Sequence, residues 1–177
     1  MKRLFVFFLM VIGGFFAFAQ TASSLDVYIL DPTDTDTNVR SAPKGNVVDK
    51  IPAEGIWMLA VSKPRNGWWQ INNGMYYDAV PDNNPDGDAF ISLHGSTTGY
   101  WIHYSCIGFG LVGNGSGHKF LAAPDNKARA VYISRIDEQV HPLELRGDWV
   151  KVVTLDGKHT GWIPTYLICD NPLTTCP

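Results

Sequence analysis

The sequence predicts an all-β protein made of two small tandem β-barrels, and three observations lead to this fold class. Short segments rich in β-branched and aromatic residues alternate with turns rich in Gly, Pro, Asn and Asp. No long stretch has the apolar spacing of an amphipathic helix. A set of proline and tryptophan positions in the first half of the chain recurs in the second half. The 177 residues suffice for one domain of average size or two small ones.

The first twenty residues have the pattern of a secretory signal peptide. Lys2 and Arg3 precede an apolar run over residues 4–18, and the sequence A-F-A at 17–19 places small residues at the −3 and −1 positions of a cut before Gln20. We expect residues 1–19 to be removed, and the mature protein to be periplasmic or secreted without a stable membrane span. An uncleaved anchor is the alternative, although the run is shorter than the ~20 residues that span a bilayer.

Strands are expected wherever β-branched and aromatic residues cluster between turns. The expected strands are residues 45–50, 56–61, 68–71, 131–136, 140–145 and 149–153. The turns that bound them are residues 52–55, 64–67, 146–148 and 156–157.

The repeat is visible in the spacing of its markers. Pro43 lies 25 positions before Trp68, and Pro124 lies 25 positions before Trp149. The next repeated tryptophan, by contrast, comes 33 positions later in the first half and 13 later in the second. The first half therefore carries an insertion of about 20 residues within residues 72–98, in its last hairpin.

These motifs resemble the bacterial SH3-like (SH3b) domain family, whose pattern is N-V-R-x-x-P, a hairpin, G-W-x-x-V, a second hairpin and G-W-hydrophobic. The first half has NVRSAP at 38–43, GWWQI at 67–71 and GYWIH at 99–103. The second half matches more loosely, with FLAAP at 120–124 in place of the first motif. The resemblance implies two tandem SH3-like β-barrels, at 26–110 and 117–170, followed by a tail at 171–177. The repeated tryptophans, Trp68, Trp101, Trp149 and Trp162, are expected to fill their cores.

The resemblance also implies a function, because SH3b domains bind cell-wall peptides or position an attached hydrolase. We expect an exported, non-catalytic protein that recognises cell-wall (peptidoglycan) peptides or an envelope protein; a structural adaptor of the envelope is the alternative. The balance of 14 basic and 17 acidic residues, without a basic run, argues against a nucleic-acid partner. The candidate ligand-binding aromatics are Trp69, Tyr76, Tyr77, Tyr100 and Tyr104. Strand alternation places Trp69 opposite a core Trp68, and burial against the insertion or the second barrel is the alternative.

Catalysis by Cys106 is a weaker hypothesis. Cell-wall cysteine peptidases often accompany SH3b domains and need a thiolate paired with histidine. His103 and His118 lie near Cys106 in sequence, but the position that matches Cys106 in the second half is Leu167, which predicts a buried thiol. We therefore expect neither an enzyme nor a cofactor.

The other two cysteines are expected to form a disulfide. Cys169 and Cys176 flank a turn at residues 171–172, and export would place them in an oxidising compartment. A Cys106–Cys169 bridge is the alternative, because connectivity does not follow from sequence alone.

The insertion contains an oxygen-rich run that partly matches a calcium loop, formed by Asp82, Asn84, Asp86 and Asp88. The twelfth position of the loop, where a glutamate is expected, is Leu93. An exposed turn without metal is therefore the preferred interpretation.

Overall fold

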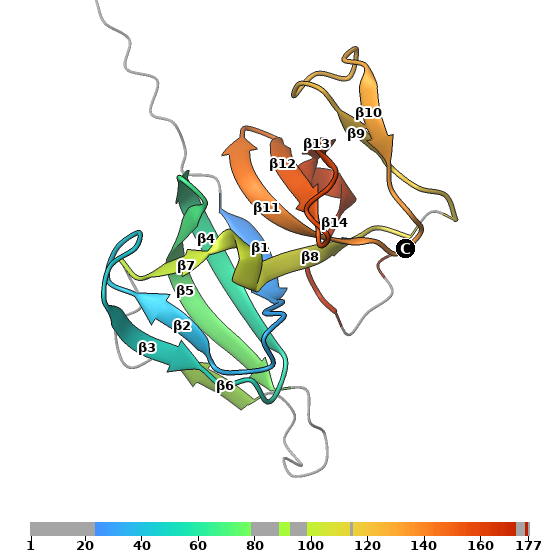
Figure 1. The fold of residues 1–177 in the computed structure, drawn as a ribbon. Coiled ribbons are helices and arrows are strands. Elements are labelled where there is room, and N and C mark those ends of the chain that lie inside the picture. Colours follow the sequence, from blue (N-terminus) through green and yellow to red (C-terminus); the bar gives the residue numbers. More distant parts are fainter. Residues whose placement is uncertain (1–23, 79–88, 93–98, 114, 173–175, 177) are drawn as a thin grey trace, which may run out of the picture.

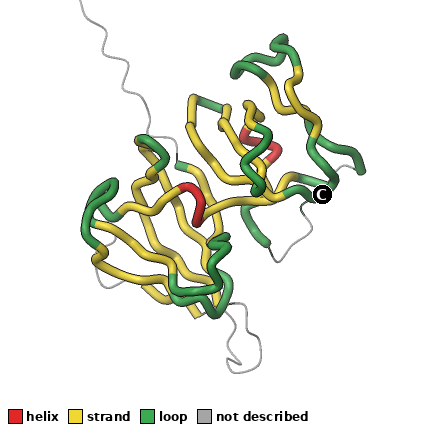
Figure 2. Tube along the Cα trace, viewed as in Figure 1, coloured by secondary structure: helices red, strands yellow, loops and turns green. Residues whose placement is uncertain are grey.

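The structure is a computed structural model that describes residues 24–78, 89–92, 99–113, 115–172 and 176. These residues form an all-β protein, as predicted, with two short 3-10 turns (Figure 2). The strands of the first half are β1 (Leu25–Ile29), β2 (Thr37–Arg40), β3 (Val47–Ile51), β4 (Trp57–Arg65), β5 (Trp68–Asp78), β6 (Ala89–Ser92), β7 (Trp101–His103) and, after the turn η1 (Tyr104–Cys106), β8 (Ile107–Leu111). Those of the second half are β9 (Lys119–Leu121), β10 (Ala130–Ile133), β11 (Gln139–Arg146), β12 (Trp149–Thr154), β13 (Thr160–Pro164) and, after η2 (Thr165–Leu167), β14 (Ile168–Cys169).

The same strand order occurs twice along one antiparallel sheet. In the first half the neighbours run β1, β4, β5, β7, β2, β3, and in the second half they run β8, β11, β12, β13, β9, β10. We call residues 25–111 the first repeat and residues 107–169 the second repeat. The repeat seen in the sequence is therefore also a repeat of strand pairing.

Strand β8 belongs to both repeats. It pairs with β1 of the first repeat, where Tyr28 lies opposite Gly108, and with β11 of the second, where Val140 lies opposite Phe109. Strand β14 then pairs with β8 in the way that β8 pairs with β1. Figure 1 shows β8 passing from one group of strands to the other. The two repeats are thus joined through backbone hydrogen bonds as well as through the chain.

The innermost side chains are not the repeated tryptophans but the residues that directly follow them. These fully buried residues are Trp69, Ile102, Val150 and Ile163. Since successive side chains of a strand point to opposite faces, each repeated tryptophan lies on the other face of its strand. The expectation that these tryptophans fill the cores is confirmed in part: Trp68 and Trp162 are buried, but none of the four belongs to the main hydrophobic cluster of the described residues.

The repeated tryptophans are covered in part by arginine. The guanidinium of Arg40 lies 5.8 Å from the ring centroid of Trp68, and that of Arg146 lies 5.0 Å from the ring centroid of Trp162. Trp68 and Trp162 are almost completely buried, whereas Trp101 and Trp149 are half-buried. The tryptophans therefore stabilise the outer faces of the sheet.

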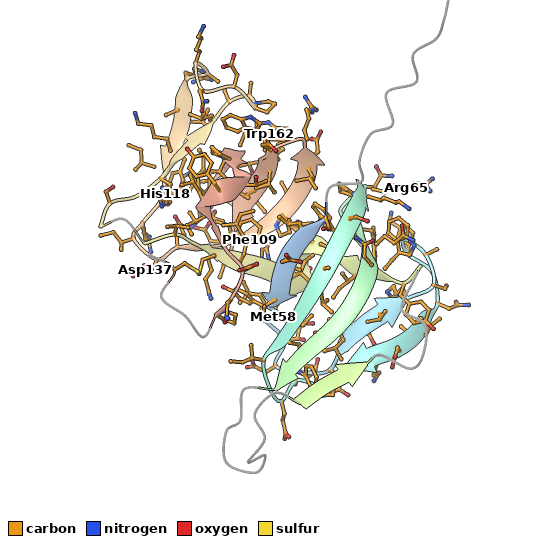
Figure 3. All side chains as sticks on the ribbon, turned by 180° about the vertical axis from the view of Figure 1, so that it is seen from behind. Met58, Arg65, Phe109, His118, Asp137 and Trp162 are labelled. Carbon is orange, nitrogen blue, oxygen red and sulfur yellow. A yellow bond between two sulfur atoms is a disulfide. The ribbon has the colours of Figure 1, made fainter. Side chains whose placement is uncertain are left out.

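One hydrophobic core runs through both repeats. It contains Val27 and Trp69 of the first repeat, Val150 of the second and Phe109 of the shared strand, all fully buried. Phe109 lies in Figure 3 where the two groups of strands meet. The side-chain amide of Gln139 also donates a hydrogen bond of 2.9 Å to the hydroxyl of Tyr28, across the same joint. The repeats are packed together over a common interior.

The insertion and the C-terminal tail both attach to the sheet. Strand β6 pairs with the end of β5, with Met75 opposite Ser92, so the insertion extends the sheet of the first repeat. The expected disulfide between Cys169 and Cys176 is present, with 5.6 Å between the Cα atoms, and Cys106 is free. The expected signal peptide at 1–19 lies outside the described residues. Across the part of the chain that is described, no helix is long and apolar enough to cross a membrane.

Candidate functional site

The prediction that Trp69 is an exposed ligand-binding residue is wrong. Its side chain is fully buried, and its indole Nε1 donates a hydrogen bond of 3.0 Å to the main-chain oxygen of Pro142 in the second repeat. The structure therefore shows the alternative, burial of Trp69 against the second half of the chain. The apolar ring of Trp69 is thus buried, and its single hydrogen-bond donor has an acceptor within the protein.

The predicted tyrosines do not form an exposed platform in the part of the chain that is described. Tyr100 and Tyr104 are half-buried and pack against the core. The ring of Tyr104 covers Gly67, whose φ of +81° and close approach leave no room for a side chain. Tyr76 and Tyr77 lie on β5, but their side chains fall outside the described residues.

A row of rings leads from the outer face of the first repeat into the joint. Ring centroids lie 5.0 Å apart for Trp68 and His103, 4.5 Å for His103 and Tyr104, and 6.0 Å for Tyr104 and His141. Burial lowers the pKa of both histidines, and the nearby His141 lowers that of His103 further. The Nδ1 of His141 lies 2.7 Å from the main-chain oxygen of Ile107 and so donates to it. Both imidazoles are thus held neutral at the joint.

Cys106 lies in η1 in surroundings that suppress its reactivity. The residue is half-buried rather than fully buried as expected, and it is linked to His103 only through the hydroxyl of Ser105. Burial, followed by the negative charge of Asp31, raises the pKa of its thiol to about 11. A thiol with this pKa is protonated at neutral pH, and the thiolate is the nucleophilic form. The site lacks the activated cysteine that a cysteine hydrolase needs.

The second repeat contains a cleft that the sequence did not reveal, which we call the Tyr132 cleft. It encloses about 350 Å³ between the connection from β10 to β11 and the turn from β12 to β13. The rings of Tyr132 and His159 stack inside it, with centroids 3.9 Å apart and an interplanar angle of 9°. Two aliphatic residues, one from each of these segments, line it and remain open to solvent, with Ile136 exposed by 58% and Leu155 by 47%. Large aliphatic side chains left exposed beside a cleft are typical of a binding surface.

The charges that line the Tyr132 cleft are mainly acidic. Asp137, Glu138 and Asp156 face a single cation, Arg135. Glu138 accepts hydrogen bonds from the Tyr132 hydroxyl at 3.3 Å and from the main-chain N–H of Arg135 at 2.9 Å.

The carboxylate of Asp156 is held by its own turn. It accepts hydrogen bonds from the Thr154 hydroxyl at 2.6 Å and from the Lys158 main-chain N–H at 3.1 Å, and it forms a salt bridge of 3.2 Å with the Lys158 ammonium. These interactions lower its pKa. Asp156 therefore stays ionised. The cleft combines an aromatic stack, apolar walls and negative charge, a set that suits a ligand with an ammonium group and small apolar groups.

Two further clefts lie nearer the joint. One, of about 310 Å³, is lined by Asp26, Asp148 and Asp170, and burial together with Asp170 raises the pKa of Asp26. The other, of about 320 Å³, has the Cys169–Cys176 disulfide in its wall. Neither brings together aromatic side chains with exposed aliphatic ones.

No metal site is formed by the residues that the structure describes: nowhere among them do three or more His, Cys, Asp or Glu side chains gather closely enough to hold an ion. The partial calcium match at Asp82, Asn84, Asp86 and Asp88 lies outside the described residues.

Sequence reasoning missed the Tyr132 cleft because its two stacked rings, Tyr132 and His159, are 27 positions apart. Tyr132 lies in a strand and His159 follows a turn, and no local motif links them. The available signal was the placement of Ile133 and Ile136 among charged residues, where apolar side chains are not expected.

No known protein family and no curated protein matches the sequence. The solved structures that match include NlpC2 and NlpC1 from Trichomonas vaginalis, each 9% identical to this chain with a TM-score of 0.30. The alignments cover 83% and 85% of this chain, and 48% and 47% of NlpC2 and NlpC1. The chain thus spans about half the length of these proteins.

Proposed function

We propose that this protein is an exported, non-catalytic binding protein made of two SH3-like domains, and that its Tyr132 cleft binds short peptides of the bacterial cell wall. The observation that carries the proposal is the cleft itself. It brings the Tyr132–His159 stack and the exposed side chains of Ile136 and Leu155 into the lining of one cleft. Such a surface favours an extended peptide that lays apolar groups on the rings.

The charge of the cleft narrows the ligand class. Cell-wall peptides combine alanine methyl groups with the side-chain amine of a diamino acid. The methyl groups suit Ile136 and Leu155, and the amine suits the carboxylate of Glu138. A purely acidic peptide would be repelled.

Two features of the fold support the assignment to SH3-like domains and to binding rather than turnover. The strand order of the first repeat recurs in the second, as two copies of one domain would require. Cys106, the only free cysteine of the described residues, has a raised thiol pKa of about 11 and no histidine in direct contact. Export is consistent with the Cys169–Cys176 disulfide.

The test is binding of the mature chain to purified peptidoglycan and to the synthetic pentapeptide L-Ala-D-γ-Glu-L-Lys-D-Ala-D-Ala, measured by sedimentation and by calorimetry. We expect His159→Ala and Glu138→Gln to weaken binding of the pentapeptide about 10-fold or more. Tyr166→Ala is the matched control, because Tyr166 is an aromatic residue of the same repeat that is 76% exposed and does not line the cleft.

Three outcomes would contradict the proposal. Binding that His159→Ala and Glu138→Gln leave unchanged would place the ligand elsewhere. Absence of binding to both probes would favour the adaptor alternative. Hydrolysis of the pentapeptide that Cys106→Ser abolishes would show an enzyme.

A further inference from the structure

Strand β10 forms a free edge of the sheet. It lies at one end of the strand order and pairs with β9 alone. The hairpin of β9 and β10 projects from the body of the protein in Figure 1. The edge is apolar as well as unpaired, because Val131 is 40% exposed and Ile133 is 61% exposed. An unpaired edge with exposed β-branched residues is a ready template for another strand.

The hairpin also carries an excess of positive charge. Residues 119–135, which we call the basic hairpin, contain Lys119, Lys127, Arg129 and Arg135, against Asp125 as the one acidic residue. The whole chain has the opposite balance, with 14 basic and 17 acidic residues.

None of these cations forms an ion pair with another residue that the structure describes. The salt bridges found among the described residues join Arg146 to Glu144 and Lys158 to Asp156. The four basic side chains of the hairpin are exposed and therefore available to an external anion.

The equivalent edge of the first repeat provides an internal comparison. Strand β3 occupies the same place in the strand order, and Val47 and Val48 are 44% and 45% exposed. The hairpin of β2 and β3, residues 37–51, is also basic but carries one cation fewer, with Arg40, Lys44 and Lys50 against Asp49. Arg40 is half-buried and donates to the oxygen of Gly45, so two exposed cations remain there against four in the basic hairpin.

We propose that the β10 edge docks an acidic, extended segment of a partner protein, which pairs with β10 as an added strand. The free backbone groups of β10 would supply main-chain hydrogen bonds, and Val131 and Ile133 would contact apolar side chains of the segment. Lys127 and Arg129 would pair with its carboxylates. Strand β10 also contributes Tyr132 to the Tyr132 cleft, but none of the four side chains named for docking lines that cleft.

The test uses the mature chain and a fluorescein-labelled peptide, Glu-Val-Glu-Thr-Glu-Val-Glu, with binding followed by fluorescence anisotropy. Two matched peptides replace every glutamate by lysine, or the central threonine by proline, which cannot donate a hydrogen bond. We expect the glutamate peptide alone to bind. The double variant Lys127→Glu/Arg129→Glu should lower the affinity for this peptide at least 10-fold. Ile133→Thr should lower it about 5-fold.

Control variants come from the other edge and from the cleft. Val48→Thr and Lys50→Glu on β3 should leave the affinity unchanged, and so should His159→Ala, which separates this proposal from the proposed function. All substituted residues of the two edges are exposed. Circular dichroism checks that each variant is folded before its binding is measured.

Each alternative occupant has its own readout. Equal binding of the proline peptide would show attraction by charge without strand pairing and would overturn the proposal. Self-association in sedimentation velocity that Ile133→Thr abolishes would identify a second copy of this chain as the occupant. Binding to phosphatidylglycerol vesicles without binding to the glutamate peptide would identify an anionic lipid surface.

Discussion

The indole Nε1 of Trp69 donates a hydrogen bond of 3.0 Å to the main-chain oxygen of Pro142, from the sheet of the first repeat to a strand of the second. Pro142 lies at a break in the register of β11, beside Glu144. The bond is fully buried and lies next to the core that both repeats share. The repeats therefore depend on each other for packing, which predicts one cooperative unfolding transition.

Replacing Trp69 with phenylalanine should lower the free energy of unfolding by about 1–3 kcal/mol, because the change leaves the oxygen of Pro142 without its donor. Urea denaturation followed by circular dichroism measures the change. Trp149→Phe is the control, since Trp149 is a half-buried tryptophan of the outer face. An equal loss of unfolding free energy in the two variants would contradict the coupling of the repeats. Two separate unfolding transitions in the parent protein would contradict it as well.

Acidification should destabilise the protein through the histidines of the joint. Burial lowers the pKa of His141 and of His103 below the ordinary value of 6.5, so the unfolded chain binds more protons than the folded one as the pH falls below about 6.5. The neutral histidines therefore stabilise the folded protein fully above this pH. Below it, the free energy of unfolding falls by at most about 1.4 kcal/mol per pH unit for each histidine.

Urea denaturation between pH 7.5 and pH 5.0 measures this dependence. In His141→Asn the side-chain amide can still donate to the oxygen of Ile107, but it does not titrate. The variant should lose less stability over this range than the parent protein. Parallel curves for parent and variant would show that His141 does not couple folding to pH.

The disulfide should stabilise the C-terminal tail. Cys169 and Cys176 are 7 positions apart, and closing so short a loop contributes about 2–3 kcal/mol in the chain-entropy description. The double variant Cys169→Ser/Cys176→Ser should melt at a lower temperature and should lose amide protection at Gly113, whose N–H donates to the oxygen of Cys176. Reduction of the parent protein should reproduce both effects, and an unchanged melting temperature would contradict the prediction.

The sequence was informative where the fold depends on spacing and turns. Equal distances from Pro43 to Trp68 and from Pro124 to Trp149 indicated a repeat, and the strand pairing repeats accordingly. Alternation also showed that Trp68 and Trp69 lie on opposite faces. It did not show which face is inside, because that depends on the second repeat, which covers Trp69.

The candidate site could not be predicted from the sequence for a related reason. Tyr132 and His159 meet only because β10 and the turn before β13 are brought together by strands that are not adjacent in sequence. No period or motif encodes such a contact. The predicted aromatics came from local patterns instead, and those whose side chains the structure describes are buried or half-buried.

Cys106 should react slowly with alkylating agents. Burial, with a further contribution from the charge of Asp31, raises the pKa of its thiol from 9.0 to about 11, so the thiolate fraction near pH 7.5 falls about 100-fold. Mass spectrometry of the folded protein after timed exposure to iodoacetamide measures the rate, with the urea-unfolded protein as the reference. Asp31→Asn should speed the reaction because it removes the negative charge beside the thiol, whereas Asp34→Asn, in the same connection, should leave the rate unchanged. A folded Cys106 that reacts as fast as the unfolded one would show an activated thiol and would reopen the hypothesis of a cysteine hydrolase.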